Sequence, residues 1–598
     1  MNKDEHLYDE LCLSIYNTNR YFHHLYGYVL EKYDLSYLQY MSLLIIYKQN
    51  SVKLMDIGAE LELSSNTLTP VIEKLVNKSW IIKVQSSQDR RVKVLKMSDQ
   101  KVTTFERILY EIRIMRDNLI HQSGRPIEEV LRENQALNQV LKKMIQEKRG
   151  MKMNYDVIFI GSGHAAWHGA QTLARSGKKI ALVEENKVAG TCTNFGCNAK
   201  ILLDGPAEMM HHLNHYHGIG INDTPNIIWP ELMAYKHQVI DPLSGGLAHM
   251  LSVDGIDIIN GHAKFLNNEK IVVVDQVYQA EKFVIATGQR PAKLPISGSE
   301  FMKDSTDFLD LPDMPKSILF VGAGYIAMEF ASIAHAAGSD VTLIEYGNHV
   351  LNGFDKVYSQ KVIEDMTEKG IHFTFNQAVS SVSLLENGQY QVDTAQGETY
   401  YVDYVMDTTG RVPNIEGLAL DDINVLYDKQ GILVNDHLQT SIDNIYASGD
   451  VISKAIPRLT PTATFESNYI ASVLLGNQEP INYPVVPTIA FTLPRVAQIG
   501  VTIDEAAKDE NLQVHEIPYG RVMRFQTLND VHAAIKIVVN KNKQLVGAAL
   551  IGDFAPEVVN ALVPVINQQY TSSDIKSQIY AFPTDSGIIL PMIANYLA

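Results

Sequence analysis

Two cysteines lie five positions apart in the stretch GTCTNFGCNAK, residues 190–200, and both are candidates for redox chemistry. The chain holds 598 residues but only three cysteines, Cys12, Cys192 and Cys197. That number is far too small for a disulfide scaffold, so we expect a cytoplasmic protein in which any disulfide is catalytic or redox-sensing. The alternative for Cys192 and Cys197 is a pair of unrelated core thiols.

The segment before these cysteines has the pattern of a nucleotide-binding strand–helix–strand unit. In YDVIFIGSGHAAWHGAQTLARSGKKIALVEE, Gly161, Gly163 and Ala166 form GxGxxA between a predicted strand and a predicted helix. The first glycine makes the tight turn, the second lets the backbone approach a pyrophosphate, and the small third residue lets helix and strand pack closely. Glu184 follows 23 residues after Gly161 and can accept hydrogen bonds from ribose hydroxyls.

The same unit occurs a second time in SILFVGAGYIAMEFASIAHAAGSDVTLIEY. It contains Gly322, Gly324 and Ala327, and Glu345 again follows the first glycine by 23 residues. Two complete units with matching spacing predict two dinucleotide sites. Because Glu345 would repel the extra phosphate of NADPH, and YGNHVLNGFD after it has no Lys or Arg, we expect NADH rather than NADPH.

Length and charge indicate a multidomain chain with two different parts. A length of 598 residues predicts about three to five domains, and no apolar run reaches about 18 residues, so we expect no membrane span. Residues 1–150 carry 22 Lys and Arg against 19 Asp and Glu, whereas the remainder carries 29 against 49. A slightly basic arm could approach nucleic acid, and a strongly acidic body would not.

From about residue 154 to 598 the sequence resembles the class I pyridine nucleotide-disulfide oxidoreductases, which include dihydrolipoamide dehydrogenase, glutathione reductase and mercuric reductase. The motifs that carry the resemblance are GTCTNFGCNAK, ATGQRP at 286–291, TTGRVPN at 408–414 and TSIDNIYASGDV at 440–451. The resemblance implies FAD on the first unit, NADH on the second and a dithiol next to the flavin. Hydride would pass from NADH to the flavin, which would reduce the Cys192–Cys197 disulfide.

The resemblance also implies roles for single residues. Cys197 would be the thiolate that lies against the flavin, and Cys192 the thiol that attacks the substrate. Lys200 and Glu329 match the ion pair beside flavin N5, although Ala199 stands where relatives have proline. Asp450 matches the aspartate that binds the ribityl chain of FAD. Further cofactor contacts are expected at Thr191, Lys200, Ala263, Thr287, Gly288, Gly410 and Ala463.

Two departures from the family concern the substrate. Disulfide reductases of this family usually have His-Pro-Thr followed by Glu near the C-terminus, donated across the dimer as an acid–base dyad. Here Phe582 replaces the histidine and Gly587 the glutamate. Because phenylalanine cannot shuttle protons, we expect poor turnover of lipoamide or glutathione disulfide. Mercuric reductases also lack that histidine but carry a C-terminal cysteine pair, which this chain lacks.

A histidine cluster lies at His211-His-Leu-Asn-His215-Tyr-His217. His211 and His215 are four residues apart and would share a helix face, which makes a metal site possible. We favour a solvated helix end and predict no metal there.

The N-terminal arm resembles the MarR winged-helix family over about residues 5–148. Residues 54–78 read as helix, turn, helix, and the second helix begins with Ser65, Asn66 and Thr67, which suit the major groove of double-stranded DNA. The next segment reads as a hairpin with Asp89, Arg90 and Arg91 near its tip, and the resemblance implies that this wing enters the minor groove. The alternative is a helical dimerisation module with a solvated basic hairpin.

Cys12 lies in a segment similar to the one-cysteine peroxide sensors among MarR proteins. Cys12 and Tyr16 are four residues apart, and Tyr26 and Tyr37 follow Cys12 at 14 and 25 residues. In those sensors matching tyrosines hydrogen-bond the thiolate, which lowers its pKa and makes it oxidisable. The alternative is a buried structural cysteine.

The expected fold is an α+β winged helix-turn-helix domain followed by an α/β flavoprotein with two dinucleotide-binding domains and an α+β C-terminal dimerisation domain. The short charged segment 147–153 marks the first boundary. The predicted domains are 1–150 for DNA binding, 151–291 and 413–482 for the two parts of the FAD-binding domain, 292–412 for NAD(P) binding and 483–598 for dimerisation.

Our first hypothesis is a fused redox regulator: a homodimer whose Cys12 sensor binds DNA when reduced, joined to an NADH-dependent flavoenzyme with a disulfide, metal or oxidant substrate. The second is a plain reductase of disulfides or of metal ions such as Hg(II) or Cu(II), whose arm serves dimerisation only. The third is a DNA-binding sensor in which FAD and NADH report redox state without turnover.

Overall fold

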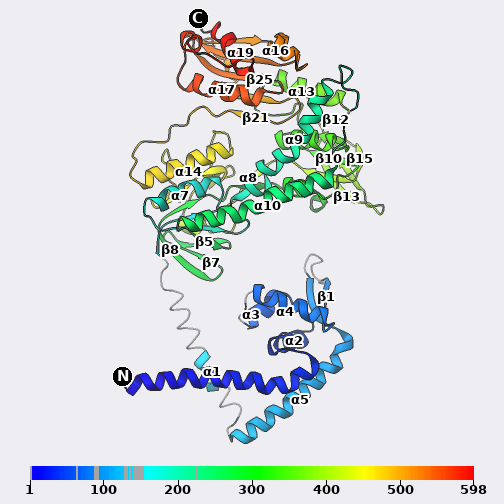
Figure 1. Ribbon diagram of the computed structural model, residues 1–598, viewed down its shortest axis with the longest axis vertical. Coiled ribbons are helices and arrows are strands. Elements are labelled where there is room, and N and C mark those ends of the chain that lie inside the picture. The colour runs from blue at the N-terminus through cyan, green and yellow to red at the C-terminus, as the bar shows by residue number, and fades with distance from the viewer. Residues whose placement is uncertain are drawn as a thin grey trace. The chain divides into compact units, whose positions relative to one another are not determined.

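The computed structural model describes residues 3–61, 63, 65–85, 93–124, 126, 132–133, 136–138, 154–223 and 225–598. The chain divides into two compact units, Met1–Lys148 and Arg149–Ala598, and each is described by itself (Figure 1). The predicted linker at 147–153 lies outside the described residues. Among the residues that are described, no helix is both long enough and apolar enough to span a membrane.

The first unit is mostly helical. Its elements in chain order are α1 (Lys3–Leu30), η1 (Glu31–Tyr33), α2 (Tyr37–Gln49), α3 (Leu54–Leu61), α4 (Ser65–Asn77), β1 (Ile81–Gln85), β2 (Lys93–Met97) and α5 (Asp99–Ser123). A capping box between Ser36 and Gln39 begins α2. The helix-turn-helix α3–α4 and the antiparallel hairpin β1–β2 follow in the order that the sequence predicts for residues 54–97. The core of this unit includes Leu30, Leu43, Leu68 and Phe105.

The second unit begins with a sheet of strand order β5-β4-β3-β8-β7-β6, to which β20 adds beside β8. Its strands are β3 (Asn154–Ile160), β4 (Ile180–Glu184), β5 (Asp257–Asn260), β6 (Ala263–Asn267), β7 (Lys270–Val273), β8 (Gln276–Ile285) and β20 (Ile445–Ala447). The neighbours β5-β4-β3-β8 are parallel, as the predicted strand–helix–strand pattern requires. Helices α7 (His164–Arg175) and α14 (Thr460–Leu474) pack together, and the Gly169 amide donates to Ser467 Oγ at 2.9 Å.

A second parallel sheet, β12-β11-β10-β16, repeats the same local plan. Strand β10 (Ser317–Val321) leads into helix α12 (Tyr325–Ala336) and then into β11 (Asp340–Ile344). The remaining elements of this part are β9 (Gln289–Pro291), α11 (Ser305–Leu309), α13 (Lys356–Glu368), β12 (His372–Thr374), β13 (Val379–Leu384), β14 (Tyr390–Thr394), β15 (Thr399–Val402), β16 (Tyr404–Asp407) and β17 (Arg411–Pro413). Each sheet thus contains a run of parallel strands whose first strand leads through a glycine loop into a helix, which agrees with the predicted pair of dinucleotide folds.

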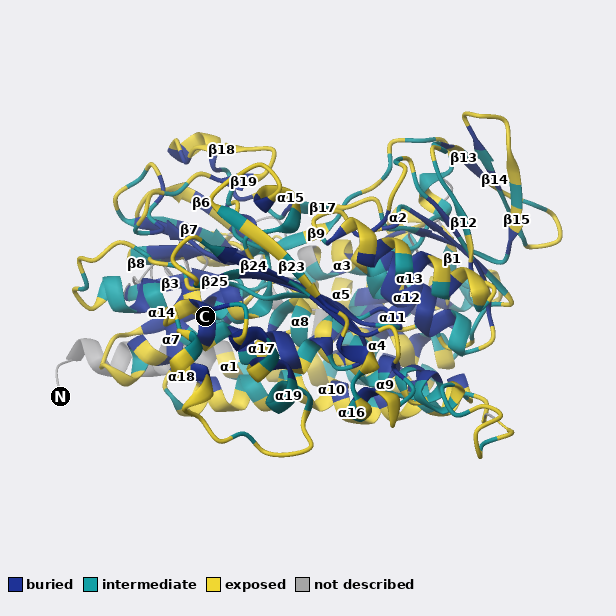
Figure 2. Cartoon of the chain, turned by 90° about the horizontal axis from the view of Figure 1, so that it is seen from above, coloured by how far each residue is buried: buried dark blue, intermediate teal, exposed yellow. Residues whose placement is uncertain are grey.

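The C-terminal part is a five-stranded antiparallel sheet of order β21-β22-β25-β24-β23. Its elements are β21 (Thr488–Ala490), β22 (Val496–Gly500), α15 (Ile503–Ala506), β23 (Leu512–Ile517), α16 (Met523–Gln526), β24 (Ala534–Asn540), β25 (Leu545–Ile551), α17 (Ala555–Asn567), α18 (Ser572–Lys576) and α19 (Asp585–Ala594). Helix α17 packs on β22 and β25, and the central strands β24 and β25 are buried (Figure 2).

Three helices connect the first sheet to these other parts. They are α8 (Gly190–Phe195), α9 (Cys197–Asn214) and α10 (Trp229–Val253). Helix α9 runs from the cysteine pair toward the C-terminal part (Figure 1). Asp204 on α9 receives two hydrogen bonds from Arg495, at 3.1 and 2.7 Å, and these side chains are only 3% and 2% exposed. This buried bidentate pair fastens the helix to the C-terminal sheet.

Replacement of Arg495 by leucine should destabilise the second unit strongly. The change leaves the Asp204 carboxylate buried without its counter-charge, which costs about 3–5 kcal/mol. Scanning calorimetry should show a lower unfolding temperature for Arg495→Leu and substantial recovery when Asp204→Leu is added. The matched control is Lys356→Met, which breaks a pair with Asp504 whose side chains are 63% and 61% exposed and should change stability little. Equal losses for the buried and the exposed pair would contradict this account.

Candidate functional site

The first glycine loop joins β3 to α7 and has a shape that only glycine allows at its first position. Gly161 has φ of 106°, and a Cβ there would lie 2.3 Å from the carbonyl oxygen of Ala286. Gly163 caps the N-terminus of α7, and Ala166 is fully buried under the loop. The predicted turn, backbone approach and close helix packing are therefore all present in the geometry.

Glu184, at the end of β4, fixes the conformation of this loop. Its Oε2 accepts hydrogen bonds from the Ser162 amide at 3.1 Å and from Ser162 Oγ at 2.5 Å. Its Oε1 accepts from the Asn186 amide at 2.8 Å. The acid thus orders the loop, and it also lines the cavity described below.

The second loop repeats this arrangement. Gly322 has φ of 94°, and Glu345 accepts hydrogen bonds from the amides of Ala323 at 2.7 Å and Gly347 at 2.8 Å. Gly324 caps α12, and Ala327 is fully buried. Gly410 is placed separately, in the segment before β17, where its carbonyl accepts from the Ala292 amide at 3.0 Å.

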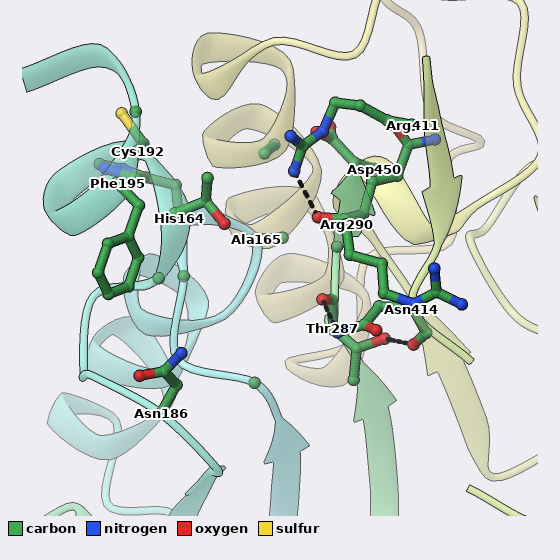
Figure 3. A pocket seen from close by; sticks show the side chains of 18 of the residues that line it. His164, Ala165, Asn186, Cys192, Phe195, Thr287, Arg290, Arg411, Asn414 and Asp450 are labelled. Atoms are coloured by element: carbon green, nitrogen blue, oxygen red, sulfur yellow. Dashed lines mark hydrogen bonds between the residues drawn. The ribbon is translucent and has the colours of Figure 1, made fainter. Parts of the chain in front are cut away.

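A cavity of about 840 Å³ extends from the first glycine loop to the cysteine pair. Of the residues predicted to contact cofactor, it is lined by Gly161, Gly163, Glu184, Thr191, Lys200, Ala263, Thr287, Gly288, Asp450 and Ala463, together with Cys192, Cys197 and Glu329. Figure 3 shows His164, Cys192 and Phe195 on one wall and Thr287, Asn414, Arg411 and Asp450 on the facing wall. An elongated cavity with a glycine cradle at one end and two thiols at the other fits FAD.

Asp450 belongs to the short helical turn η4 (Gly449–Val451). Burial raises its pKa, while Lys454, Arg411 and Arg458 act in the opposite direction. The carboxyl group therefore faces the cavity among three cationic side chains, in a position to accept hydrogen bonds from a polar ligand.

The two thiols are in unequal environments. Cys192 lies in α8, Cys197 is the first residue of α9, and both are free thiols. The hydrogen bond from Cys192, aided by Thr460 and Lys200, lowers the pKa of Cys197 to about 6. The same hydrogen bond, together with burial, raises the pKa of Cys192. Cys197 is therefore the thiolate of the pair and Cys192 the protonated partner.

Lys200 lies one turn after Cys197 and pairs with Glu329 of α12 at 3.4 Å. Burial raises the pKa of Glu329, and Lys200 is the strongest influence that lowers it. The Phe491 amide donates to Glu329 Oε1 at 2.8 Å, and the Lys200 ammonium lies 3.5 Å from the centre of the Phe491 ring. The backbone amide and the ring of Phe491, in the C-terminal part of the chain, thus hold the ion pair in place.

Sequence reasoning did not identify Thr460, Phe491 or Arg495. The Thr460 hydroxyl lies 3.7 Å from Cys197 Sγ. Each of these residues is more than 250 positions from its partner on α9, so no local spacing could have indicated the contact.

The histidine cluster is not a solvated helix end, and that interpretation was wrong. His211 is only 5% exposed, and its Nε2 lies 2.9 Å from Asp553 Oδ1. His217 is exposed. His211 can be buried because the carboxylate of Asp553, 342 residues away, meets its ring.

In the first unit the structure brings two of the predicted sensor residues together. The rings of Tyr26 and Tyr37 meet edge to face, with their centres 5.1 Å apart, and burial raises the pKa of both. Tyr16 is 64% exposed. Cys12 belongs to α1, but its side chain lies outside the described residues.

The predicted DNA-contacting residues are described only in part. Ser65, Asn66 and Thr67 form the first turn of α4, and the Thr67 side chain is exposed. The side chains of Ser65 and Asn66, and the whole of Asp89, Arg90 and Arg91, lie outside the described residues.

The segment that replaces the acid–base dyad lies just before and within α19. The Phe582 side chain is 87% exposed. Gly587 is the third residue of α19, and its amide donates to Thr584 Oγ1 at 3.3 Å.

Comparison with known proteins agrees with this geometry. Residues 155–467 match the family model of the pyridine nucleotide-disulphide oxidoreductases, and residues 486–591 match that family's dimerisation domain. Residues 24–108 match the family model Transcriptional regulator SarA/Rot. This last match supports a regulator domain but does not specify the MarR family.

Several relatives are similar over the whole reductase part. A dihydrolipoyl dehydrogenase of Staphylococcus aureus is 31% identical over 441 residues, which cover 72% of this chain and 94% of that enzyme. A glutathione reductase of Burkholderia cepacia is 30% identical over 439 residues, which cover 72% and 97%.

Among solved structures, the HOCl-induced flavoprotein disulfide reductase RclA from Escherichia coli has a TM-score of 0.67 and 26% identity, covering 74% of this chain and 99% of that one. A Cu(II) complex of an RclA variant has the same TM-score. By these matches, and by its two nucleotide loops and paired thiols, the chain belongs to the pyridine nucleotide-disulphide oxidoreductase family, as an FAD-dependent oxidoreductase with an N-terminal transcriptional-regulator domain.

Proposed function

We propose that this oxidoreductase uses NADH to reduce a thiophilic acceptor through Cys192 and Cys197, and that its N-terminal domain is a redox-responsive DNA-binding regulator. The observation that carries the enzymatic part is the unequal thiol pair at the end of the 840 Å³ cavity. Bound FAD supplies the two-electron relay between nicotinamide and disulfide. In net terms, NADH and the disulfide yield NAD⁺, a thiol at Cys192 and a thiolate at Cys197.

The positions of the site residues support the roles proposed for them. Gly161, Gly163 and Ala166 would admit the pyrophosphate to the N-terminus of α7, and Glu184 would bind the ribose. Asp450 would accept hydrogen bonds from the ribityl hydroxyls. Lys200 and Glu329 would present a fixed ion pair at the dithiol end of the cavity. The remaining predicted cofactor contacts at Thr191, Ala263, Thr287, Gly288 and Ala463 all line that cavity.

NADH is the proposed reductant because of the second loop. Gly322, Gly324 and Ala327 would hold its pyrophosphate and Glu345 its ribose. Both oxygens of Glu345 are already anchored by backbone amides, so its negative charge stays beside the ribose position. That charge disfavours the 2′-phosphate of NADPH.

The proposed acceptor is a thiophilic metal ion such as Hg(II) or Cu(II). Phe582 offers no proton shuttle for a dithiol product, whereas metal reduction by the thiol pair needs none. Thiol and thiolate plus Hg(II) give the disulfide, Hg(0) and one proton, and two Cu(II) ions balance as two Cu(I). The Cu(II) complex of RclA supports this choice. A disulfide acceptor is the alternative.

The N-terminal domain is proposed to be a MarR-type winged helix that binds double-stranded DNA as a homodimer. Ser65, Asn66 and Thr67 would face the major groove, and the hairpin with Asp89, Arg90 and Arg91 the minor groove. Cys12 would be the sensor thiol, with Tyr16, Tyr26 and Tyr37 as hydrogen-bond donors. Support comes from the regulator-family match and from the paired rings of Tyr26 and Tyr37. The reductase would re-reduce Cys12 or remove the same oxidant.

Anaerobic addition of NADH to the FAD-loaded protein should produce a long-wavelength thiolate-to-flavin absorption band. Cys197→Ser should abolish the band because it removes the thiolate, and the matched variant Cys192→Ser should keep it. The thiolate exists above its pKa, so the band should be full at pH 8 and fall as pH decreases through about 6. NADPH should be much less effective than NADH. Complete bleaching of the wild-type flavin without the band would show that the thiols are not coupled to it.

The double variant Phe582→His/Gly587→Glu should gain reduction of a small disulfide such as lipoamide. General acid–base catalysis contributes roughly 100-fold or more, so a rise in kcat of at least about 10-fold is expected. Phe582→Leu with Gly587→Glu is the size-matched control without a titrating ring. Cu(II) reduction should change little in either variant. Wild-type lipoamide turnover equal to that of the double variant would favour the disulfide alternative.

Arg90→Ala/Arg91→Ala should weaken binding to double-stranded DNA, because two phosphate or minor-groove contacts are lost. Lys264→Ala/Lys508→Ala, which removes two exposed lysines from the reductase part, is the charge-matched control. Peroxide should release DNA from the wild-type protein but not from Cys12→Ser, and NADH should then restore binding. Unchanged DNA binding in the Arg90/Arg91 variant would support an arm that serves dimerisation only. If NADH does not restore DNA binding although the enzyme is active, the reductase and the DNA-binding domain are not functionally coupled.

A further inference from the structure

The C-terminal end of α9 presents three imidazoles to one buried carboxylate. His211, His212 and His215 occupy the last turn of the helix and the residue after it. Asp553 lies in the loop between β25 and α17, and its side chain is 3% exposed. Neither the dithiol chemistry nor the dinucleotide loops use this cluster.

The donor atoms are already close to one another. Asp553 Oδ1 lies 2.9 Å from His211 Nε2, and Oδ2 lies 3.3 Å from His212 Nε2 and 3.5 Å from His215 Nδ1. One ligand atom from each of His211, His215 and Asp553 falls within 4.8 Å of the other two. The Nε2 of His212 is shielded from solvent, and Asp553 is the group that it faces.

We propose that this cluster is a site for a divalent transition-metal ion, with His211, His215 and Asp553 as ligands and His212 as the adjacent fourth donor. Imidazole nitrogen and carboxylate oxygen are the donor types that Zn²⁺ and Cu²⁺ prefer. Ligands at about 2.0–2.2 Å in a tetrahedron lie roughly 3.3–3.6 Å apart, which two of the three contacts to Asp553 nearly match. Small side-chain rotations would bring the ligand atoms of the three residues to metal-binding distances.

The surroundings hold the donors in place. The His215 carbonyl accepts a hydrogen bond from Asn529 Nδ2 at 2.7 Å, and Phe554 stacks on His212 with ring centres 6.1 Å apart. Side-chain exposure rises from 5% for His211 to 20% for His215 and 39% for His212, so solvent ions have a route from the His212 side. Outer contacts of this kind are what fix ligand orientation in metal sites.

Lys369 sets the affinity of this site. Its ammonium can only donate, and it contacts His211 Nδ1 at 3.0 Å, so the His211 proton resides on Nε2 and bonds Asp553. When a metal ion binds Nε2, that proton moves to Nδ1, where it would face the Lys369 ammonium, so Lys369 must turn away from the ring. Lys369 keeps two other acceptors, Asp365 at 2.5 Å and the Leu493 carbonyl at 3.2 Å, so this movement leaves it paired.

This site is distinct from the redox centre. His211 follows Cys197 by 14 residues along α9, which corresponds to about 20 Å at 1.5 Å per residue. A bound ion would connect α9, the helix that begins at Cys197, to the C-terminal part of the chain. It would not be the acceptor that takes electrons from the thiols.

Zinc binding by the full-length, FAD-loaded protein tests the proposal. The background carries Cys192→Ser/Cys197→Ser, because thiols would bind Zn²⁺ themselves. Titration calorimetry with ZnCl₂ should show one equivalent bound in this background. Adding His215→Ala should weaken binding at least 10-fold, whereas adding His217→Ala, an exposed neighbour, should leave it unchanged. Zn²⁺ should also raise the unfolding temperature in the background and not in the His215→Ala protein.

Lys369→Gln provides the second arm of the test. Its amide oxygen can accept a hydrogen bond from the Nδ1–H of metal-bound His211, so zinc affinity should rise several-fold in the same background. No bound zinc in the background, or equal binding with and without His215, would overturn the proposal. Weaker binding in Lys369→Gln would exclude His211 as a ligand. None of these outcomes depends on the identity of the electron acceptor, so a negative zinc experiment would leave the proposed function unaffected.

Discussion

Burial of charged and polar side chains along helix α9 is the constraint on which the reductase part depends. Lys200 and Asp204 are one turn apart on one face, and His211 lies about two turns further along that face. Each is met by a partner from another segment. Glu329 comes from the second nucleotide fold, and Arg495 and Asp553 from the C-terminal sheet. Any sliding or rotation of the helix would break all three contacts at once. Leaving a buried charge or polar group without its partner costs free energy, so the helix is held in one position.

That fixed helix explains why two chemically identical thiols behave differently. Cys197 is the first residue of α9, where the free backbone amides favour an anion. Lys200, one turn on, adds a positive charge, and Cys192 donates its S–H from the preceding helix. A thiolate needs such partners to exist near neutral pH. The different roles of Cys192 and Cys197 therefore come from their positions in the fold, since both are the same residue type.

The features that could be predicted from the sequence are the ones encoded by short spacing. Gly161 with Glu184, and Gly322 with Glu345, are set by one strand–helix–strand unit, so their geometry is nearly independent of the rest of the chain. The helix-turn-helix over 54–77 is local in the same sense. Arg495 with Asp204 could not be predicted, because these residues are 291 positions apart and meet only through the tertiary fold.

The histidines show where the local rule fails. The spacing correctly predicted that His211 and His215 share one helix face. Whether the His211 side chain is solvated or buried depends on Asp553, which lies 342 residues from it in the sequence. A helix end rich in histidine and without a visible partner is ordinarily solvated. The partner came from the loop after β25, which carries no motif that links it to α9.

In the proposed function, the two halves of the chain would use one physical device for their thiols. In the reductase part, the neutral S–H of Cys192 donates to the Cys197 thiolate. In the N-terminal domain, burial raises the pKa of Tyr26 and Tyr37, so both hydroxyls stay protonated and remain donors. A neutral donor beside a thiol stabilises the anion without adding a counter-charge that would itself need partners. Under the proposed sensor role, such neutral donors would act on Cys12 as Cys192 acts on Cys197.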